Sequence, residues 1–325
     1  MTWLVTGGAG YIGAHVVRAL QAAGIAPVVV DDLSSGHASF VPEGVPFVEG
    51  TILHRGLLAD TMREHGVTGV IHVAGFKYAG VSVQRPLHTY EQNVEGTRVV
   101  LAAMADAGVH NIVFSSSAAV YGTPDVPLVT EDLPKRPASP YGESKLIGEW
   151  LLRDQGIATA SDDQPLRHTS LRYFNVVGSA DPTVYDTSPH NLFPIVFEKL
   201  IAGEVPQING DDYDTPDGTN VRDYVHVGDI AAAHVVAAQR LEAGEPIEAA
   251  YNLGSQNGLS VREIMDAVAR VTGIDFTPRI GSRRPGDPDR IVATGELAAR
   301  DLDWANRYTV DEMVRTGWDA RRNAR

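Results

Sequence analysis

Short apolar runs alternate with longer amphipathic stretches through the first half of this sequence, and that alternation limits the possible folds more than any other feature. The runs are rich in branched residues, and several are apolar nearly throughout, as in strands that are covered on both faces. We expect strands over residues 3–6, 27–31, 46–49, 70–74, 112–116 and 169–174. We expect helices between them over residues 11–23, 57–65, 91–107 and 141–155. Repeated strand–helix units of this length predict an α/β fold with a doubly wound parallel sheet.

Glycines and polar segments mark the boundaries of these elements. Gly24, Gly66 and Gly108 come just after three of the expected helices, where a left-handed residue is favoured. From about Asn175 the pattern becomes irregular, with segments at 178–191 and 210–220 that are rich in polar residues, and with helices expected over 192–202, 227–243 and 261–272. Because no flexible linker separates the two parts, we expect them to pack closely around a cleft.

A glycine-rich turn joins the first expected strand to the first expected helix. Its sequence runs from Thr6 to Gly13 as TGGAGYIG, and Gly7, Gly10 and Gly13 allow the backbone to approach a pyrophosphate at the helix N-terminus. A glycine triplet alone is a weak signal, since glycines also occur in ordinary turns. Here Asp31 ends the next strand, 18 positions after Gly13, which is close to the spacing of an acid that holds an adenosine ribose.

The residues around Asp31 indicate which dinucleotide this turn binds. The carboxylate can accept hydrogen bonds from both ribose hydroxyls and repels a 2′-phosphate, and the following run DDLSSG over residues 31–36 contains no Arg or Lys. The sequence therefore favours NAD over NADP. Glycine spacing alone does not separate NAD from FAD, and a structural turn followed by a solvent-exposed acid is the plainer alternative.

Tyr141 and Lys145 stand four residues apart at the start of an expected helix, so their side chains share one face. A phenol with a pKa of about 10 is a poor base at neutral pH. A nearby cation, together with a positively charged nicotinamide, favours the phenolate. The pair is a weak signal alone, but the serine cluster 115–117 precedes it at the end of a buried strand, where ligands collect in parallel sheets.

Composition excludes several classes of protein. A formal net charge of −14 argues against general nucleic-acid binding, and no apolar run approaches the roughly 18–20 residues that span a bilayer. The absence of cysteine excludes disulfides, thiolate metal sites and a cysteine nucleophile, and the eleven histidines show no metal-ligand spacing. His72 lies in an apolar strand and is expected to be a core residue. The first ten residues predict no signal peptide, and we expect a cytoplasmic protein with no metal and no membrane partner.

Several motifs together resemble the extended short-chain dehydrogenase/reductase superfamily. They are the glycine turn, NVEGT at 93–97, FSSSAAVYG at 114–122, the Tyr141/Lys145 pair and RYFN at 172–175. Within that superfamily, VAGFK at 73–77, DGTNVRDYVH at 217–226 and YNLG at 251–254 resemble the UDP-glucose 4-epimerases, and the similarity covers essentially the whole chain. We expect a Rossmann NAD-binding domain over 1–175, with a contribution from about 224–245. A smaller mixed α/β region over 176–325 is expected to be mainly substrate-binding.

The resemblance implies that NAD-mediated oxidation and re-reduction at sugar C4 interconvert UDP-glucose and UDP-galactose, a step of galactose metabolism. Tyr141 would remove the proton of the 4-hydroxyl, Ser117 would relay it, and Lys145 would hold the nicotinamide ribose. The implied cofactor contacts are Gly7, Gly10, Tyr11, Ile12, Gly13, Asp31, Asp32, Leu33, Ser34, Ser35, Gly36, Thr51, Ile52, Val73, Ala74, Gly75, Lys77, Asn93, Ser115, Tyr141, Lys145 and Phe174. The implied substrate contacts are Lys77, Ser117, Tyr141, Asn175, Asn191, Leu192, Arg222, Arg284 and Asp287.

The sequence departs from the family pattern at a few positions. Thr51 stands where an aspartate usually meets the adenine amino group, so one adenine contact is expected to be altered. Ile291 stands where a tyrosine or a smaller residue separates epimerases by their tolerance of N-acetyl groups. Isoleucine is smaller than tyrosine, and acceptance of a UDP-N-acetylhexosamine is therefore one alternative.

Other epimerases, two related enzyme classes and a non-catalytic NAD sensor are the alternatives to this activity. A UDP-uronate or UDP-pentose 4-epimerase would use identical C4 chemistry. A 4,6-dehydratase needs carboxylates beside the catalytic serine, where this chain has Ala118 and Ala119, and a decarboxylating relative usually has a glutamate there. A non-catalytic NAD sensor could keep the glycine turn, although such proteins commonly lose the Tyr/Lys pair. The helices at 91–107 and 141–155 pair across subunits in related enzymes, so we expect a homodimer.

Overall fold

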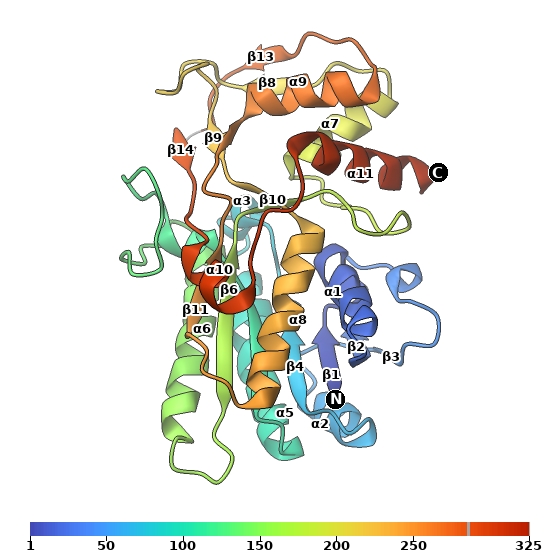
Figure 1. Ribbon diagram of the computed structural model, residues 1–325, viewed down its shortest axis with the longest axis vertical. Coiled ribbons are helices and arrows are strands. Elements are labelled where there is room, and N and C mark those ends of the chain that lie inside the picture. The colour runs from blue at the N-terminus through green and yellow to red at the C-terminus, as the bar shows by residue number, and fades with distance from the viewer. Residues whose placement is uncertain (285–286, 325) are drawn as a thin grey trace.

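A computed structural model describes residues 1–284 and 287–324 of the chain (Figure 1). The main elements of the first half are β1 (Thr2–Thr6), α1 (Tyr11–Ala22), β2 (Ala26–Asp31), β3 (Phe47–Glu49), α2 (Arg55–Glu64), β4 (Gly69–His72), α5 (Gly96–Ala107), β5 (Asn111–Ser117), α6 (Pro140–Ala158) and β6 (Arg167–Tyr173). Short helical segments connect them: η1 (Ala38–Phe40), α3 (Ala79–Ser82), α4 (Pro86–Tyr90), η2 (Glu91–Glu95) and η3 (Ala118–Tyr121).

The second half has shorter strands between its helices. Its elements are β7 (Asn175–Val177), α7 (Leu192–Ile201), β8 (Gln207–Asn209), β9 (Val221–Arg222), β10 (Tyr224–His226), α8 (Val227–Ala243), β11 (Ala250–Leu253), β12 (Leu259–Ser260), α9 (Val261–Thr272), β13 (Arg279–Gly281), β14 (Arg290–Ile291), α10 (Glu296–Leu302) and α11 (Val310–Asn323). None of the helices in the described ranges is both long and apolar enough to cross a bilayer.

Seven strands form one sheet in the order β11-β6-β5-β4-β1-β2-β3, and every neighbouring pair is parallel. The chain builds outward from β1 in one direction, and then from β4 in the other. This confirms the predicted doubly wound α/β fold. In such sheets a ligand cleft forms outside the carboxyl ends of the strands where the strand order reverses, here between β1 and β4.

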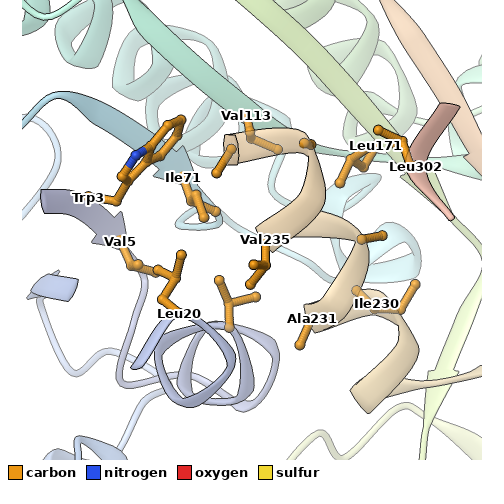
Figure 2. Close-up of a cluster of buried hydrophobic side chains, with 14 of the residues drawn as sticks. Trp3, Val5, Leu20, Ile71, Val113, Leu171, Ile230, Ala231, Val235 and Leu302 are labelled. Carbon is orange, nitrogen blue, oxygen red and sulfur yellow. The ribbon is translucent and has the colours of Figure 1, made fainter. Parts of the chain in front are cut away.

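Both faces of the sheet are covered, which explains the nearly continuous apolar strands. In β1, Trp3 and Val5 point to one face and Leu4 to the other. Figure 2 shows the first face, where Trp3 and Val5 pack with Leu20 of α1 and Val235 of α8. On the opposite face, Leu4 belongs to a cluster with buried side chains of α2, α5 and α6. Each fully buried side chain of this size contributes about 1.5–3 kcal/mol.

The helices α7, α9 and α11 and the short strands β8, β9 and β13 gather at one end of the molecule, at the top of Figure 1. There α7, α9 and α11 surround a third apolar cluster that includes Phe197, Ile264 and Trp318. Small sheets join β7 with β10, β8 with β13, and β9 with β12 and β14. The polar segments at 178–191 and 210–220 contain no helix or strand, as expected for loops, and the short strands β7, β8 and β9 lie directly beside them.

The predicted boundaries agree closely with the structure for the longer elements. The helices predicted over 227–243 and 261–272 are α8 and α9, and Gly24, Gly66 and Gly108 have φ values of 74°, 58° and 69°. The helix predicted over 91–107 is instead a π-helical turn, η2, followed by α5. The predicted domain division stays a prediction. From the second half, α8 packs against α1, β11 pairs with β6, and α10 packs against α8 and β11.

Candidate active site

A cavity of about 710 Å³ opens at the carboxyl ends of the central strands and is bounded by the second half of the chain. Most of the predicted site residues line it. They are Gly7, Gly10, Tyr11, Ile12, Gly13, Asp31, Asp32, Ser34, Ser35, Ile52, Val73, Ala74, Gly75, Lys77, Ser117, Tyr141, Lys145, Phe174, Asn175, Asn191, Leu192, Arg222, Arg284 and Asp287. The predicted residues that do not line it are Leu33, Gly36, Thr51, Asn93 and Ser115.

The glycine turn brings the backbone close to the cavity floor. Gly7 has a φ of 73°, and a Cβ atom added to Gly13 would lie 2.1 Å from the Gly7 carbonyl oxygen. No side chain caps α1, whose N-cap is Gly10. The first N–H groups of this helix therefore face the cavity, and this arrangement suits a phosphate.

Asp31 organises the turn as well as facing the cavity. Its two carboxylate oxygens accept hydrogen bonds from the backbone N–H groups of Ala9 (3.0 Å) and Leu33 (2.8 Å). Burial raises the pKa of Asp31, and these two hydrogen bonds oppose the increase. Gly36 packs directly against this turn, because an added Cβ would lie 2.8 Å from the carbonyl group of Ala9. Leu33 and Gly36 thus shape the turn without lining the cavity.

Tyr141 lies in the first turn of α6, which begins after Ser139. The Ser139 hydroxyl accepts a hydrogen bond from the Gly142 N–H, and the Tyr141 N–H donates to the Ser82 hydroxyl at 3.1 Å. Burial raises the pKa of the Tyr141 phenol, and a hydrogen bond with Ser117 opposes this. The predicted acid/base and the predicted proton relay therefore line the same cavity, and the serine acts on the pKa of the phenol.

Lys145 is buried, and its ammonium group donates a hydrogen bond to the backbone carbonyl of Ser115 at 2.8 Å. Burial lowers the pKa of Lys145 to about 8, although the charge of Glu149 acts in the opposite direction. The expectation that a nearby cation makes the Tyr141 phenol more acidic is not met by the protein groups alone, because the net shift of the Tyr141 pKa is upward. The sequence-based expectation also included a positively charged nicotinamide beside the phenol, which belongs to the cofactor and not to the protein.

Ser115 and Asn93 are buried and do not line the cavity themselves, but both form hydrogen bonds next to it. The Ser115 hydroxyl bonds to Nε2 of His234 at 3.1 Å. The Asn93 side chain accepts from the Phe76 N–H at 2.6 Å and donates to the Phe76 carbonyl at 3.0 Å and to the Ser144 hydroxyl at 2.8 Å. Asn93 thus connects the loop that carries Lys77 to the helix that carries the catalytic pair.

The other end of the cavity is polar. Asp287 forms an ion pair with Arg222 and accepts from the Asn220 amide at 2.9 Å. The Asn209 amide, with its oxygen toward Arg284, accepts from Nε and Nη2 of that guanidinium at 3.1 and 3.0 Å. The family resemblance identified the two arginines, and Asn220 lies in the DGTNVRDYVH motif without being singled out, but no local pattern marked Asn209.

Asp186 is a cavity residue that the sequence analysis missed. Its carboxylate accepts from the Asn191 amide at 2.8 Å and from the Ser188 N–H at 2.9 Å. Burial raises the pKa of Asp186, while the Asn191 hydrogen bond and the charge of Lys77 lower it. The only signal in the sequence was an acid in a polar loop of unusual composition. Tyr173 also lines the cavity, although the RYFN motif drew attention only to its neighbours.

The two residues at which the sequence departs from the family pattern, Thr51 and Ile291, do not line the cavity. The Thr51 hydroxyl accepts from the Leu53 N–H at 3.3 Å and does not line the cavity. Ile291 packs against a cluster that includes Val120 and Tyr121, also outside the cavity lining. Within residues 1–284 and 287–324, no group of three or more His, Asp or Glu side chains is arranged to hold a metal ion.

Residues 3–254 match the family model described as NAD dependent epimerase/dehydratase family. The chain belongs to this family. The NAD dependent epimerase/dehydratase family match spans the whole main sheet, the glycine turn and the Tyr141/Lys145 pair. This confirms the family that the sequence motifs indicated.

Similarity continues over the full chain. A UDP-glucose 4-epimerase of Azospirillum brasilense is 43% identical over 319 residues, which are 96% of this chain and 90% of that protein. A UDP-glucose 4-epimerase structure from Stenotrophomonas maltophila, with bound NAD and formylated UDP-arabinopyranose, has a TM-score of 0.93 and 40% identity over 99% of this chain and 98% of that one. The Brucella ovis enzyme in complex with NAD has a TM-score of 0.92 and 39% identity, covering 98% and 97%.

Proposed function

We infer that this chain is an isomerase that interconverts UDP-glucose and UDP-galactose through NAD-dependent oxidation and re-reduction at C4 of the sugar. One observation carries the proposal: Tyr141, Ser117 and Lys145 line the same cavity as the glycine turn and Asp31. Full-length similarity to proteins named UDP-glucose 4-epimerase supports it.

The start of α1 and the Asp31 carboxylate both have the chemistry that NAD binding needs. The start of α1 has no side-chain cap and offers backbone N–H groups to a pyrophosphate. Each Asp31 oxygen uses one lone pair for the turn and keeps another for a ribose hydroxyl. When bound, NAD⁺ supplies a hydride acceptor and a positive charge beside the phenol.

Tyr141 would accept the proton of the sugar 4-hydroxyl as C4 loses its hydride, and would return a proton when C4 is reduced again. Ser117, which bonds to Tyr141, would hold the 4-oxygen in both directions. Arg222 and Arg284 would clamp the diphosphate, because a guanidinium matches phosphate oxygens in pairs. With the nucleotide end fixed, the sugar can present either face of C4 to the same groups.

The test is a product assay on the purified protein. UDP-glucose should be converted to UDP-galactose, and the reverse reaction should reach the same final ratio without added oxidant or reductant. Equal amounts of the UDP-N-acetylhexosamines, UDP-uronates and UDP-pentoses are assayed in parallel. Absence of UDP-galactose, or faster turnover of another UDP-sugar, would overturn the assignment.

The comparisons do not favour the alternative substrates. The N-acetylhexosamine hypothesis depended on Ile291, which lies outside the cavity lining. A non-catalytic NAD sensor is tested with a UV spectrum, because a sugar reductant plus UMP should generate bound NADH in an epimerase and should leave a silent binder unchanged. The cytoplasmic location stays a prediction.

The proposal extends to the homodimer expected from the helices at 91–107 and 141–155, which are η2 with α5, and α6. Exposed apolar side chains on α6, and on α4, which packs against α6, support it. Trp150 and Ile157 lie two turns apart on α6 with 46% and 69% of their surface exposed, and Leu87 of α4 is 83% exposed. Burying such apolar side chains against a second copy would remove them from water. Light scattering should give twice the chain mass, and Trp150→Glu should shift the protein to a monomer; a monomeric unchanged chain would exclude the dimer.

A further inference from the structure

Glu149 is a buried acid that the mechanism above does not use. It lies on α6, two helical turns after Tyr141 and one after Lys145, so the three side chains share one face of the helix. Only 10% of its side chain is exposed, and only 6% of that of its ion-pair partner Arg172. A buried charge is costly unless it is well paired, so the stability of the Glu149 carboxylate depends on its partners.

The Glu149 carboxylate joins three elements. Its Oε1 atom accepts from the Ser116 hydroxyl of β5 at 2.6 Å and from Nε of Arg172 of β6 at 2.8 Å. Its Oε2 atom accepts from Nη2 of Arg172 at 2.6 Å. Arg172 in turn donates to the Tyr121 hydroxyl at 2.7 Å. The helix is thereby fixed against two strands by three hydrogen bonds to one side chain.

Each of these three elements carries part of the candidate active site. Ser116 directly precedes Ser117, Arg172 precedes Tyr173 and Phe174, and α6 holds Tyr141 and Lys145. We propose that Glu149 is a positioning residue of the active site, whose carboxylate sets α6 against β5 and β6 and so fixes the phenol, the ammonium group and the serine relative to one another. The proposal rests on the proposed function for the roles of those groups.

Glu149 also supplies the negative charge that acts on Lys145. Burial favours the neutral amine at Lys145, and the Glu149 carboxylate favours the ammonium form. Other titratable groups lie around Lys145 or around the Ser115 segment that it bonds: Tyr141 on α6, Tyr173 on β6, His72 on β4 and His234 on α8. Burial raises the pKa of both tyrosines and lowers that of both histidines, so all four are neutral near pH 7.

A purely structural ion pair would behave differently from a positioning residue. Removing one partner of a buried pair destabilises a fold, whereas removing both partners is often tolerated. The informative variants are therefore Glu149→Gln, which keeps the shape and removes the charge, Glu149→Asp, which keeps the charge, and the double variant Glu149→Met with Arg172→Met. Asp154→Asn is the matched control, because Asp154 is an exposed acid on the same helix that pairs with its neighbour Arg153.

Kinetics on the holoenzyme separate the two explanations. In Glu149→Gln we expect kcat to fall about ten- to a hundred-fold with KM for UDP-glucose within about two-fold, and the alkaline limb of the kcat–pH profile to move to lower pH. Glu149→Asp should restore that limb. The double variant should regain the wild-type melting temperature but not kcat. Wild-type kcat and pH profile in the double variant would overturn the proposal, since the pair would then be structural only.

A second measurement does not depend on activity. The chain has four lysines, Lys77, Lys135, Lys145 and Lys199, so NMR of lysine labelled at its side chain can follow Lys145 directly, with Lys145→Met as the assignment control. The Lys145 pKa should be lower in Glu149→Gln than in the wild type and unchanged in Asp154→Asn. An unaltered Lys145 titration would overturn the electrostatic part of the proposal even if the wild type proved to have a different substrate.

Discussion

The Nζ atom of Lys145 lies 6.0 Å from the centre of the Tyr141 ring, one helical turn away, and its hydrogen bond goes to the Ser115 carbonyl and not to the phenol. Lys145 can therefore act on Tyr141 only through space. The Ser117 hydroxyl acts to lower the pKa of the phenol, and Ser117 is the group proposed to meet the sugar 4-oxygen. This arrangement leaves the phenolic oxygen free to exchange a proton with substrate.

Tyr141→Phe removes that oxygen and keeps the ring. Because positioned acid–base catalysis contributes about 10²–10⁴-fold, we expect kcat to fall by about 10³-fold with the amount of bound NAD unchanged. The measurement is turnover of UDP-glucose together with the absorbance of the purified protein. Tyr90→Phe is the control, because the Tyr90 hydroxyl bonds to Glu143 outside the cavity, and its activity should stay within two-fold of wild type. Undiminished epimerisation by Tyr141→Phe would remove the tyrosine from the mechanism.

Gly13→Ala tests the glycine turn. The new Cβ would lie 2.1 Å from the Gly7 carbonyl oxygen and 2.9 Å from Cα of Gly8, so the turn must open. We expect the protein to be purified with little or no NAD and to melt at a lower temperature. Gly80→Ala is the matched control, since nothing lies within 4 Å of its added Cβ and its φ is not positive. A Gly13→Ala protein with a full complement of cofactor would contradict the placement of the pyrophosphate.

Strand ends explain why so much of the site could be predicted. The glycine turn follows β1, Asp31 ends β2, Ser117 ends β5 and Phe174 follows β6. In a parallel sheet these carboxyl ends meet at one edge, so recognising the strands already brings the residues together. Helical spacing places Tyr141 and Lys145 on one face, and the serine cluster at the end of β5 is what makes this pair a site prediction.

Long-range contacts explain what could not be predicted. The sequence of η2 predicts an ordinary α-helix, whereas the structure has a π-helical turn there. This turn contains Asn93, whose side chain makes three hydrogen bonds to Phe76 and Ser144. The position of Asp186 depends on the path of an irregular loop, and that of Asn209 on the pairing of two three-residue strands. None of these contacts leaves a periodic pattern in the sequence.

Thr51→Asp tests the departure from the family pattern at the adenine end. Thr51 lies between Gly50 and Ile52, which both line the cavity, and its hydroxyl accepts from the Leu53 N–H. An aspartate can keep that bond with one oxygen and offer the other to the adenine amino group. A net hydrogen bond of about 0.5–1.5 kcal/mol corresponds to about 2- to 13-fold tighter NAD binding.

The measurement for Thr51→Asp is the dissociation constant of NAD, obtained by calorimetry after the cofactor has been stripped. Thr51→Val removes the hydroxyl without adding a carboxylate and should show no gain. Equal affinity in Thr51→Asp and Thr51→Val would mean that the adenine does not reach this residue.

Four buried histidines predict a loss of stability in mild acid. Burial lowers the pKa of His15, His226 and His234 to about 4 and that of His72 to about 3. In the unfolded chain each would titrate near 6.5. Their contribution to stability is complete above pH 6.5 and is lost as the pH falls toward 4, because the unfolded chain then binds protons that the native state does not.

Four acids work against this trend, because burial also raises the pKa of Asp31, Asp186, Asp223 and Asp229. Burial raises the pKa of Asp223 to about 6, so its contribution is present below its unfolded pKa and is lost as the pH rises through 6. With His168, five histidines have a lowered pKa against four acids with a raised one. Each titrating group adds up to about 1.4 kcal/mol per pH unit, so the free energy of unfolding should fall between pH 6.5 and 5. Urea titrations at several pH values measure this slope. His234→Asn should reduce the slope by about one proton. A free energy of unfolding that is constant from pH 6.5 to 5 would show that these imidazoles are protonated in the native state.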